Sequence, residues 1–259
     1  MYQTLYTKLL ERTDATLFLD KTPRYYLILS ELKEVFPTAK YILLVRHPLS
    51  VLTSVLRTWV KNNWLRLTNY KKDLIDAPKR IIGAQERFGT STLLVRYEDL
   101  VQRPEDKLSD LCGHLEIDFE PDMIHYRTDT GENWVFGDPE SVYEHSRPKT
   151  SSLEKWVQPE NAQEWRLLWE YAHLLGSDIF EMFGYSFETC TAKLQRIQPS
   201  SRDLRYTASL EQLMETRSDV TKKWLRYKIS MMETMREEGA TEVAIYAFEK
   251  LKNRVCNIT

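Results

Sequence analysis

Arg46 is the residue whose position most directly indicates chemistry. It ends the apolar run Tyr41–Arg46, which is typical of a buried strand, and Pro48 two residues later suits the first turn of a helix. A guanidinium beside a helix N-terminus is well placed to bind phosphate, because its forked donors and the free backbone N–H groups favour an anion. The alternative is an ordinary ion pair with a surface carboxylate. The placement therefore predicts an anion site and leaves a structural role open.

Further polar side chains follow this arginine and a second apolar run. Ser50 and Ser54 lie one helical turn apart on the same predicted face, where they are either hydroxyl donors to the anion or simply small helix residues. Asp20 and Lys21 end the run Thr16–Lys21. Because ligands collect at the carboxyl ends of parallel strands, we expect these groups near the same edge of a sheet.

Three short apolar runs would form that sheet, and helical stretches separate them. The runs are Thr16–Lys21, Tyr41–Arg46 and Thr92–Tyr97, and none alternates strictly between apolar and polar residues. Such runs are typical of strands that are covered on both faces. Strands that alternate with helices predict an α/β fold with a parallel sheet flanked by helices.

The rest of the chain is organised around two changes in composition. Residues 120–150 are polar and irregular, and long loops of this kind inside a domain are often functional. After residue 190 a linker-like stretch leads into charged amphipathic helices. We therefore expect an α/β domain over residues 1–190 and a C-terminal helical extension over 191–259. Those last helices are candidates for packing back on the domain, for a homodimer contact or for an interaction module.

Composition excludes several classes of function. The net charge of -2 and the pI near 6.3 argue against general binding to nucleic acid or to a membrane surface. No apolar run reaches 18 residues, so no membrane span is expected. The five histidines show no metal-ligand spacing, so we expect no metal. Three widely spaced cysteines and an N-terminus unlike a signal peptide favour a cytoplasmic location.

Several stretches in this order resemble the sulfotransferases that use 3′-phosphoadenosine 5′-phosphosulfate (PAPS), in particular the carbohydrate and bacterial types. The stretches are "FLDKTPRYY", "LLVRHPLSVLTS", "LLVRYEDLVQRPEDKLSDLCGHLEIDF" and "SRPKTSSLEKW" with the helix that follows it. The resemblance covers residues 16–187. It implies a P-loop-NTPase-like sulfotransferase fold and sulfuryl transfer from PAPS to a hydroxyl of a small molecule or carbohydrate.

The resemblance also implies which residues bind the nucleotide. Arg46 and Ser54 have the eight-residue spacing of the family's 3′-phosphate element. Tyr97 would lie near the adenosine, and its alternative role is that of a core tyrosine. Arg147 or Lys149 would contact PAPS from the family's closing loop, which aligns only loosely here.

The same resemblance implies two catalytic residues. Asp20 would accept the proton of the acceptor hydroxyl, and Lys21 would stabilise the charge that develops on the bridging oxygen or sulfonate. Some relatives use a histidine base in this region, where this chain has Pro23. The alternative for Asp20 is a purely structural pairing with Lys21, Arg24 or another neighbour.

One signature of the family is missing from its expected place. The glycine–hydroxyl loop that holds the 5′-phosphosulfate should precede the stretch "FLDKTPRYY", which begins at Phe18, but the residues before it contain no glycine or proline. The run Arg87–Leu94 resembles that loop, but it follows a helix and enters a strand, so Gly89 is expected to cap the helix instead. The chain is therefore expected to lack the first strand and loop of the fold.

Two alternatives to an active enzyme follow from this departure. The chain could be a truncated sulfotransferase, or a degenerate homologue without catalysis that acts as a binding or assembly protein. A P-loop kinase or nucleotide hydrolase is disfavoured, because no G-x-x-x-x-G-K-[ST] run is present.

Overall fold

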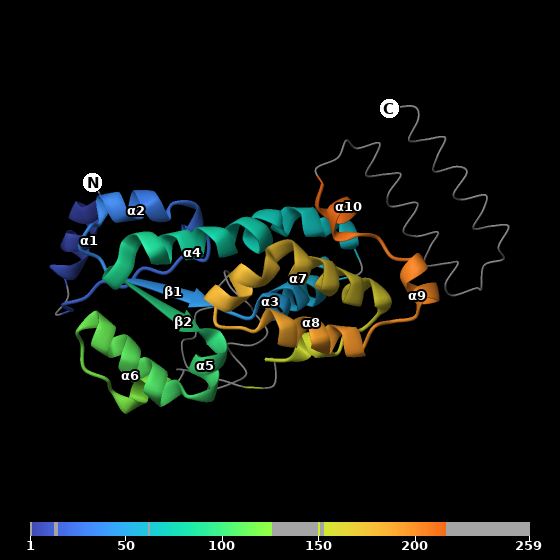
Figure 1. Cartoon of the computed structure of the whole chain (residues 1–259). Helices are drawn as coiled ribbons and strands as arrows, with labels where there is room; N and C mark the ends of the chain where they lie inside the picture. Colours follow the sequence, from blue (N-terminus) through green and yellow to red (C-terminus); the bar gives the residue numbers. More distant parts are fainter. Residues whose placement is uncertain (1, 13–14, 62, 126–149, 151–152, 216–259) are drawn as a thin grey trace, which may run out of the picture.

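The computed structural model describes residues 2–12, 15–61, 63–125, 150 and 153–215 (Figure 1). Within them a two-stranded parallel sheet pairs β1 (Tyr41–Val45) with β2 (Thr92–Arg96). The register runs from Tyr41 opposite Thr92 to Val45 opposite Arg96, so the two strands end side by side. This confirms the parallel α/β arrangement and two of the three predicted strands.

Helices make up most of the described chain. The α-helices are α1 (Tyr2–Leu10), α2 (Leu29–Val35), α3 (Pro48–Ser54), α4 (Ala77–Phe88), α5 (Tyr97–Gln102), α6 (Pro104–Leu115), α7 (Ala162–Met182), α8 (Phe187–Arg196), α9 (Ser201–Arg205) and α10 (Leu210–Met214). The 3-10 helices are η1 (Tyr25–Leu27), η3 (Trp64–Tyr70), η5 (Gly89–Ser91), η6 (Pro121–Ile124) and η8 (Lys155–Val157). Two π-helical turns are η2 (Val55–Val60) and η4 (Lys72–Asp76).

The sheet lies between two layers of helices. Figure 1 shows α2 and α4 on one side of the strands and α5 and α6 on the other. The Tyr41 ring packs against Phe88 of α4 with the ring centroids 5.3 Å apart. Gly89 ends α4 with φ +53, a backbone conformation that glycine adopts without steric penalty. The expected helix cap is thus confirmed, and the run Arg87–Leu94 joins α4 to β2.

The prediction of a third strand over Thr16–Lys21 is wrong. These residues are irregular and pair with no strand of the described chain. Leu17 is 42% exposed and Leu19 is 71% exposed, whereas a strand covered on both faces would bury both. A short apolar run has the same pattern in a strand and in an extended segment, so only a pairing partner distinguishes the two.

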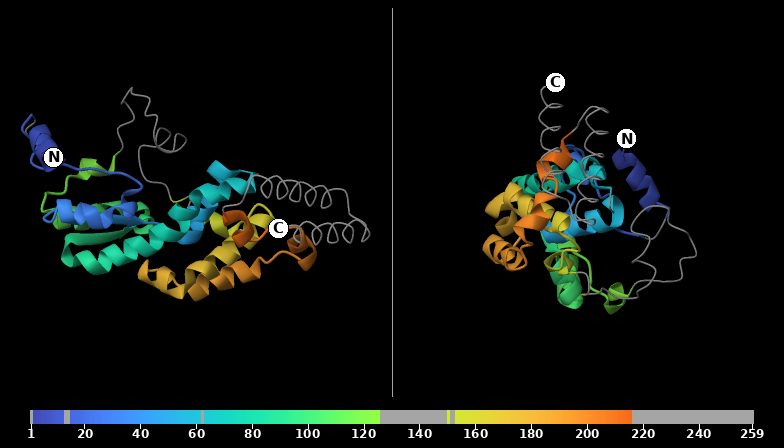
Figure 2. Two further views of the ribbon diagram at one scale, coloured as in Figure 1. Left: turned by 90° about the horizontal axis from the view of Figure 1, so that it is seen from above. Right: turned by 90° about the vertical axis from the view of Figure 1, so that its right-hand side faces the viewer.

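The helices α7, α8 and α10 pack with α3 and the short helices η2 to η4 around the main hydrophobic core, which also includes Val45 of β1. α7 is broken at Gly176, where φ is +77. Figures 1 and 2 show α9 and α10 at the opposite end of the described chain from α1. The boundary predicted at residue 190 falls inside α8, and Leu194 and Leu213 after it are buried in the same core as α7. The C-terminal helical extension over residues 191–259 stays a prediction, and residues 216–259 of it lie outside the described residues.

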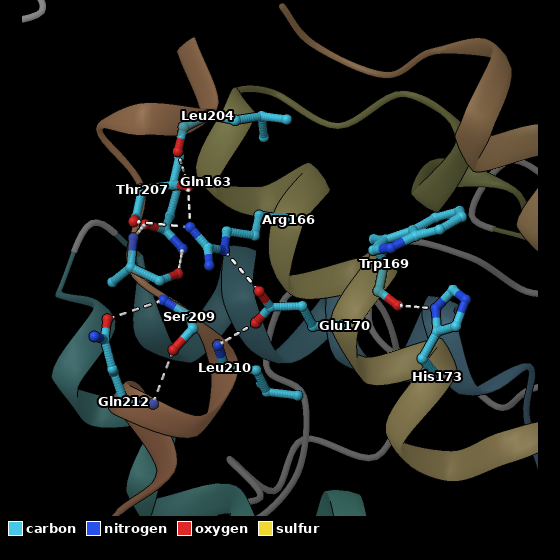
Figure 3. Close-up of polar contacts among 11 residues, drawn as sticks. Gln163, Arg166, Trp169, Glu170, His173, Leu204, Thr207, Ser209, Leu210 and Gln212 are labelled. Atoms are coloured by element: carbon cyan, nitrogen blue, oxygen red, sulfur yellow. Dashed lines mark hydrogen bonds and ion pairs between the residues drawn. The ribbon is translucent and has the colours of Figure 1, made fainter. Parts of the chain in front are cut away.

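Three α7 side chains hold the backbone of the segment that leads into α10 (Figure 3). Gln163 donates from Nε2 to the Ala208 carbonyl at 2.8 Å and accepts from the Ala208 N–H at 2.6 Å. The remaining bonds run from Arg166 to the Thr207 carbonyl at 3.2 Å and from the Leu210 N–H to Glu170 at 2.6 Å. Backbone N–H and carbonyl groups that are buried need hydrogen-bond partners. In this segment, which is neither helix nor strand before residue 210, the side chains of α7 supply them.

Candidate functional site

The junction of β1 and α3 brings Arg46 and Tyr97 together. Arg46 directly follows β1, and Tyr97 directly follows β2. Because the two strands run parallel and in register, these residues meet where the sheet ends. The Arg46 guanidinium carbon lies 4.8 Å from the centroid of the Tyr97 ring, and both side chains are half-buried. A cation on an aromatic face in this position suits a phosphate with an attached ring.

The two serines of α3 differ in what they can do. The Ser50 hydroxyl is buried and donates to the Leu153 carbonyl at 2.8 Å, so its proton is already used. Of the two alternatives that the sequence left open, this contact favours a structural role for Ser50 over that of a donor to a ligand. Ser54 is the last residue of α3 and is exposed, so it remains the serine that a ligand can reach.

The N-terminus of α3 is capped by a histidine. The Nδ1 atom of His47 accepts the Leu49 N–H at 3.2 Å, so the proton of the neutral ring sits on Nε2. Nε2 lies 3.1 Å from the Cys190 sulfur and thus donates to it. The ring is buried and stacks on Trp156 with centroids 4.8 Å apart. None of these contacts is predicted from the sequence.

Burial makes this histidine–cysteine pair unreactive near neutral pH. It lowers the pKa of His47 to about 3, with the nearby cations Lys193, Arg96 and Arg46 adding to the effect. Burial also raises the pKa of the Cys190 thiol to about 11. A neutral histidine with so low a pKa is a weak base, and a protonated thiol is a poor nucleophile. The pair therefore packs the core.

A buried carboxylate ties the same region together. Glu98 accepts the His47 backbone N–H at 3.0 Å through Oε1 and the Tyr185 hydroxyl through Oε2. Burial, followed by this hydrogen bond, raises the pKa of Tyr185 above its usual value, so the phenol stays a donor. Glu98 thereby links the start of α5 to the start of α3 and to the turn after α7.

A cavity of about 690 Å³ with a mixed polar and apolar lining opens beside this network. Its charged walls are largely paired within the protein. Arg96 donates to the Gly184 carbonyl at 2.8 Å, and its guanidinium carbon lies 4.5 Å from the Tyr185 ring centroid. Lys193 forms an ion pair with Glu154 at 2.8 Å. The cavity is lined by residues from positions 47 to 193, so no local sequence pattern could have predicted it.

The predicted catalytic residues lie on the irregular segment that precedes η1. Asp20 and Lys21 are both exposed. Asp20 accepts hydrogen bonds at 2.5 Å from the hydroxyls of Tyr6 and Tyr25, rather than pairing with Lys21 or Arg24. Arg24 instead pairs with Asp73.

The predicted residues thus fall into separate sets of contacts. Asp20 is held by aromatic residues of the N-terminal segment, and Arg46 packs on the residue that follows β2. Arg147 and Lys149 lie outside the described residues. In the part of the chain that the structure describes, no cluster of His, Cys, Asp or Glu could hold a metal ion, and no helix is long and apolar enough to cross a membrane.

Comparison with known proteins adds independent information. Residues 1–121 match the model of the sulfotransferase family, and this range includes Asp20, Lys21, Arg46, Ser54 and Tyr97. The chain is 25% identical over 203 residues to the nodulation protein NoeE of Sinorhizobium fredii, which covers 70% of this chain and 47% of that protein. It is 26% identical over 132 residues to protein-tyrosine sulfotransferase A of Caenorhabditis elegans, which covers 49% of this chain and 35% of that protein.

A solved structure with some similarity is the sulfotransferase domain from the curacin biosynthetic pathway. It is 28% identical, covers 60% of each chain and superposes with a TM-score of 0.49. The present chain spans less than half the length of the two curated relatives above.

Proposed function

We propose that this chain, which belongs to the sulfotransferase family, binds PAPS and transfers its sulfuryl group to a hydroxyl of a small molecule or carbohydrate. Three points are proposed here: that PAPS is the donor, that a hydroxyl is the acceptor and that the chain catalyses the transfer. The two relatives named above are larger proteins, so their own activities are not carried over to this chain.

The single observation that supports the proposal most is the contact between Arg46 and Tyr97 at the ends of β1 and β2. The guanidinium sits 4.8 Å from the ring centroid, which orients its N–H donors beside a flat aromatic surface. Guanidinium binds phosphate through two parallel charge-assisted bonds. In the proposed complex Arg46 binds the 3′-phosphate and Tyr97 lies against the adenosine.

Ser54 would complete the 3′-phosphate site. It is exposed at the end of α3, whereas Ser50 on the same helix is already bonded to Leu153. Arg147 is proposed to contact PAPS from the loop that precedes residue 150. That role rests on the family resemblance alone, because Arg147 lies outside the described residues.

The chemistry requires a base and a cation. As the acceptor oxygen forms its bond to sulfur, its proton passes to Asp20, and the bond from sulfur to the 5′-phosphate oxygen breaks. Lys21 stabilises the negative charge that collects on the leaving oxygen. Positioning and preorganised charge supply most of the rate in such transfers, and a carboxylate base adds about 10²–10⁴-fold.

A binding or assembly protein without catalysis is the second candidate, and a specific observation favours it. In the described ranges, 2–12, 15–61, 63–125, 150 and 153–215, no glycine–hydroxyl loop follows a strand and opens a helix. The run Arg87–Leu94 lies between α4 and β2, where it cannot cradle a phosphate at a helix N-terminus. The candidate nucleotide residues Arg46, Ser54 and Tyr97 therefore suit the 3′-phosphate end of PAPS, and the described chain offers no matching loop for the 5′ end.

Calorimetric titration with 3′,5′-adenosine bisphosphate tests the proposed nucleotide site. We expect Arg46→Ala to weaken binding by about ten- to a hundred-fold, because a charge-assisted bond contributes roughly 1.5–3 kcal/mol. Arg66→Ala, which removes an exposed arginine from η3, is the matched control and should bind like the wild type. Absence of binding by the wild type at millimolar ligand would refute the site.

Turnover separates the two candidate functions. Transfer of labelled sulfate from PAPS to a panel of hydroxyl acceptors would support the enzyme, and nucleotide binding without transfer would support the degenerate homologue. The cytoplasmic location and a homodimer through the C-terminal helices stay predictions.

A further inference from the structure

The carboxylate of Asp20 accepts hydrogen bonds from two tyrosine hydroxyls, one from a residue before it in the sequence and one from a residue after it. The hydroxyl of Tyr6 on α1 and the hydroxyl of Tyr25 at the start of η1 each donate to Oδ2 of Asp20 at 2.5 Å. Tyr6 lies 14 residues before Asp20 and Tyr25 lies five after it. Neither tyrosine has a role in the site described above.

Each phenol is itself held by neighbouring groups. The Tyr6 ring stacks on Phe18 with centroids 4.3 Å apart and on Phe36 at 5.4 Å. Tyr25 adjoins Tyr26, which is buried and donates to Asp73 at 2.6 Å. These contacts hold the Tyr6 ring and the backbone around Tyr25 in place, and with them the two hydroxyls.

The turn that carries Tyr25 has a second anchor on the same Asp73 carboxylate. Arg24 donates to both oxygens of Asp73 at 3.0 and 2.7 Å. Asp73 belongs to η4, so the turn is tied to the helical part of the chain. Asp20 itself is on a segment without strand pairing, and the two phenols therefore orient its carboxylate.

Both phenols are protonated near neutral pH, because the usual pKa of tyrosine is about 10 and the contact with Asp20 raises it further. The hydrogen bond of Asp20 to each hydroxyl is the largest cause that raises the pKa of Tyr6 and of Tyr25 above the usual value. Both tyrosines are thus donors throughout the neutral range, and neither is available as a base.

We propose that Tyr6 and Tyr25 are positioning residues that hold Oδ2 of Asp20 and thereby aim Oδ1 at the acceptor hydroxyl. The assignment rests on the proposed function, in which Asp20 is the base. The acceptor proton moves to Oδ1, the acceptor oxygen bonds to sulfur, and the electron pair of the broken sulfur–oxygen bond leaves on the 5′-phosphate. The phenols keep their protons throughout.

Steady-state kinetics on the full chain test this assignment with Tyr6→Phe, Tyr25→Phe, Asp20→Asn and the two double variants that combine Asp20→Asn with either Phe substitution. Each single Phe variant should lower kcat about ten-fold and leave the KM for PAPS unchanged, since misplacement of a reacting group lowers the rate without removing nucleotide contacts. In the Asp20→Asn background the same Phe substitutions should have no further effect, because the tyrosines act through Asp20.

Tyr41→Phe is the matched control. Its hydroxyl donates to the Leu32 and Phe36 carbonyls, so the variant loses a phenol donor from the same part of the chain without touching Asp20. It should lower thermal stability and keep the wild-type kcat. Melting curves of the two test variants establish that each is folded at the assay temperature.

The outcomes separate this inference from the function on which it rests. A wild type that turns over, with both Phe variants at wild-type kcat, overturns the positioning role alone. A rise in KM with kcat intact, or equal losses in the wild-type and Asp20→Asn backgrounds, also overturns it. A wild type with no turnover defeats the proposed function and the positioning role together.

Discussion

The segments 15–22 and 207–210 both lack regular structure over most of their length, yet they are held in opposite ways. The backbone of residues 207–210 is hydrogen-bonded to three α7 side chains: Arg166 donates to it, Glu170 accepts from it and Gln163 does both (Figure 3). The helix α10, which begins at the end of this segment, buries Leu210, Leu213 and Met214 in the main core. Residues 15–22 are exposed throughout.

This difference separates stability from chemistry in the molecule. The segment 207–210 is held by both hydrophobic packing and hydrogen bonds, so loss of a single contact should leave its conformation unchanged. The segment 15–22 depends on a few side-chain contacts, chiefly the phenols of Tyr6 and Tyr25 on Asp20, and it leaves its polar groups accessible. Ligand-binding segments are commonly drawn from such lightly packed parts of a fold.

The largest test of this comparison truncates one leucine in each region. Leu213 of α10 is 1% exposed and Leu19 is 71% exposed. Leu213→Ala should lower the free energy of unfolding by about 2–5 kcal/mol, because it removes buried methyl groups and leaves a cavity. Leu19→Ala should change it by less than about 0.5 kcal/mol. The free energy of unfolding of both variants is measured in urea. Equal losses for Leu213→Ala and Leu19→Ala would contradict the difference in packing between the two regions.

A smaller effect is expected from the polar clamp that Gln163 forms on Ala208. Gln163→Ala removes both bonds to Ala208, which is 1% exposed, and leaves a buried N–H and carbonyl without their partners. The loss should be about 1–3 kcal/mol. Gln212→Ala, which removes the glutamine side chain of the capping box in the first turn of α10, is a milder control at about 0.5–1 kcal/mol. A clamp variant as stable as the wild type would show that burial of α10 suffices.

The smallest effect concerns pH and the buried His47. Burial lowers its folded-state pKa to about 3, below the usual value near 6.5. Its contribution to stability is therefore complete above pH 6.5 and is lost as the pH falls toward 3, because the unfolded chain binds the proton first. Between pH 7.5 and 5.5 the loss should be about 1.4 kcal/mol.

Chemical denaturation at the two pH values measures this loss. His47→Gln removes the titrating group, so its stability should vary less with pH over the same interval, whatever its absolute value. An identical slope for the variant and the wild type would assign the pH dependence to other groups.

The strands and helix starts could be predicted because their signals are local. Pro48 and Pro104 stand in the first turns of α3 and α6, where a missing N–H is harmless. The run at 16–21 misled for a related reason. Its apolar residues satisfy the pattern of a strand, but strand formation also needs a neighbouring chain, and the pattern carries no information about it.

The candidate site was predicted only in part. Arg46 and Tyr97 were both named from motifs, and their contact follows from the parallel register of β1 and β2. The bonds of Tyr6 to Asp20 and of Glu98 to His47 were missed. They join residues 14 and 51 positions apart, and neither pair has a spacing that any single element would impose.

The sequence by itself determined the α/β class, two of the strands, the placement of an arginine at a strand end and a resemblance to the sulfotransferases. Those properties depend on local periodicity, helix-breaking residues and short motifs. Only the tertiary structure decided that Ser50 is used internally, that His47 is a buried neutral cap and that two tyrosines grip Asp20. The role of a polar side chain depends on what it meets in space, and burial and distant partners set that role after the chain has folded.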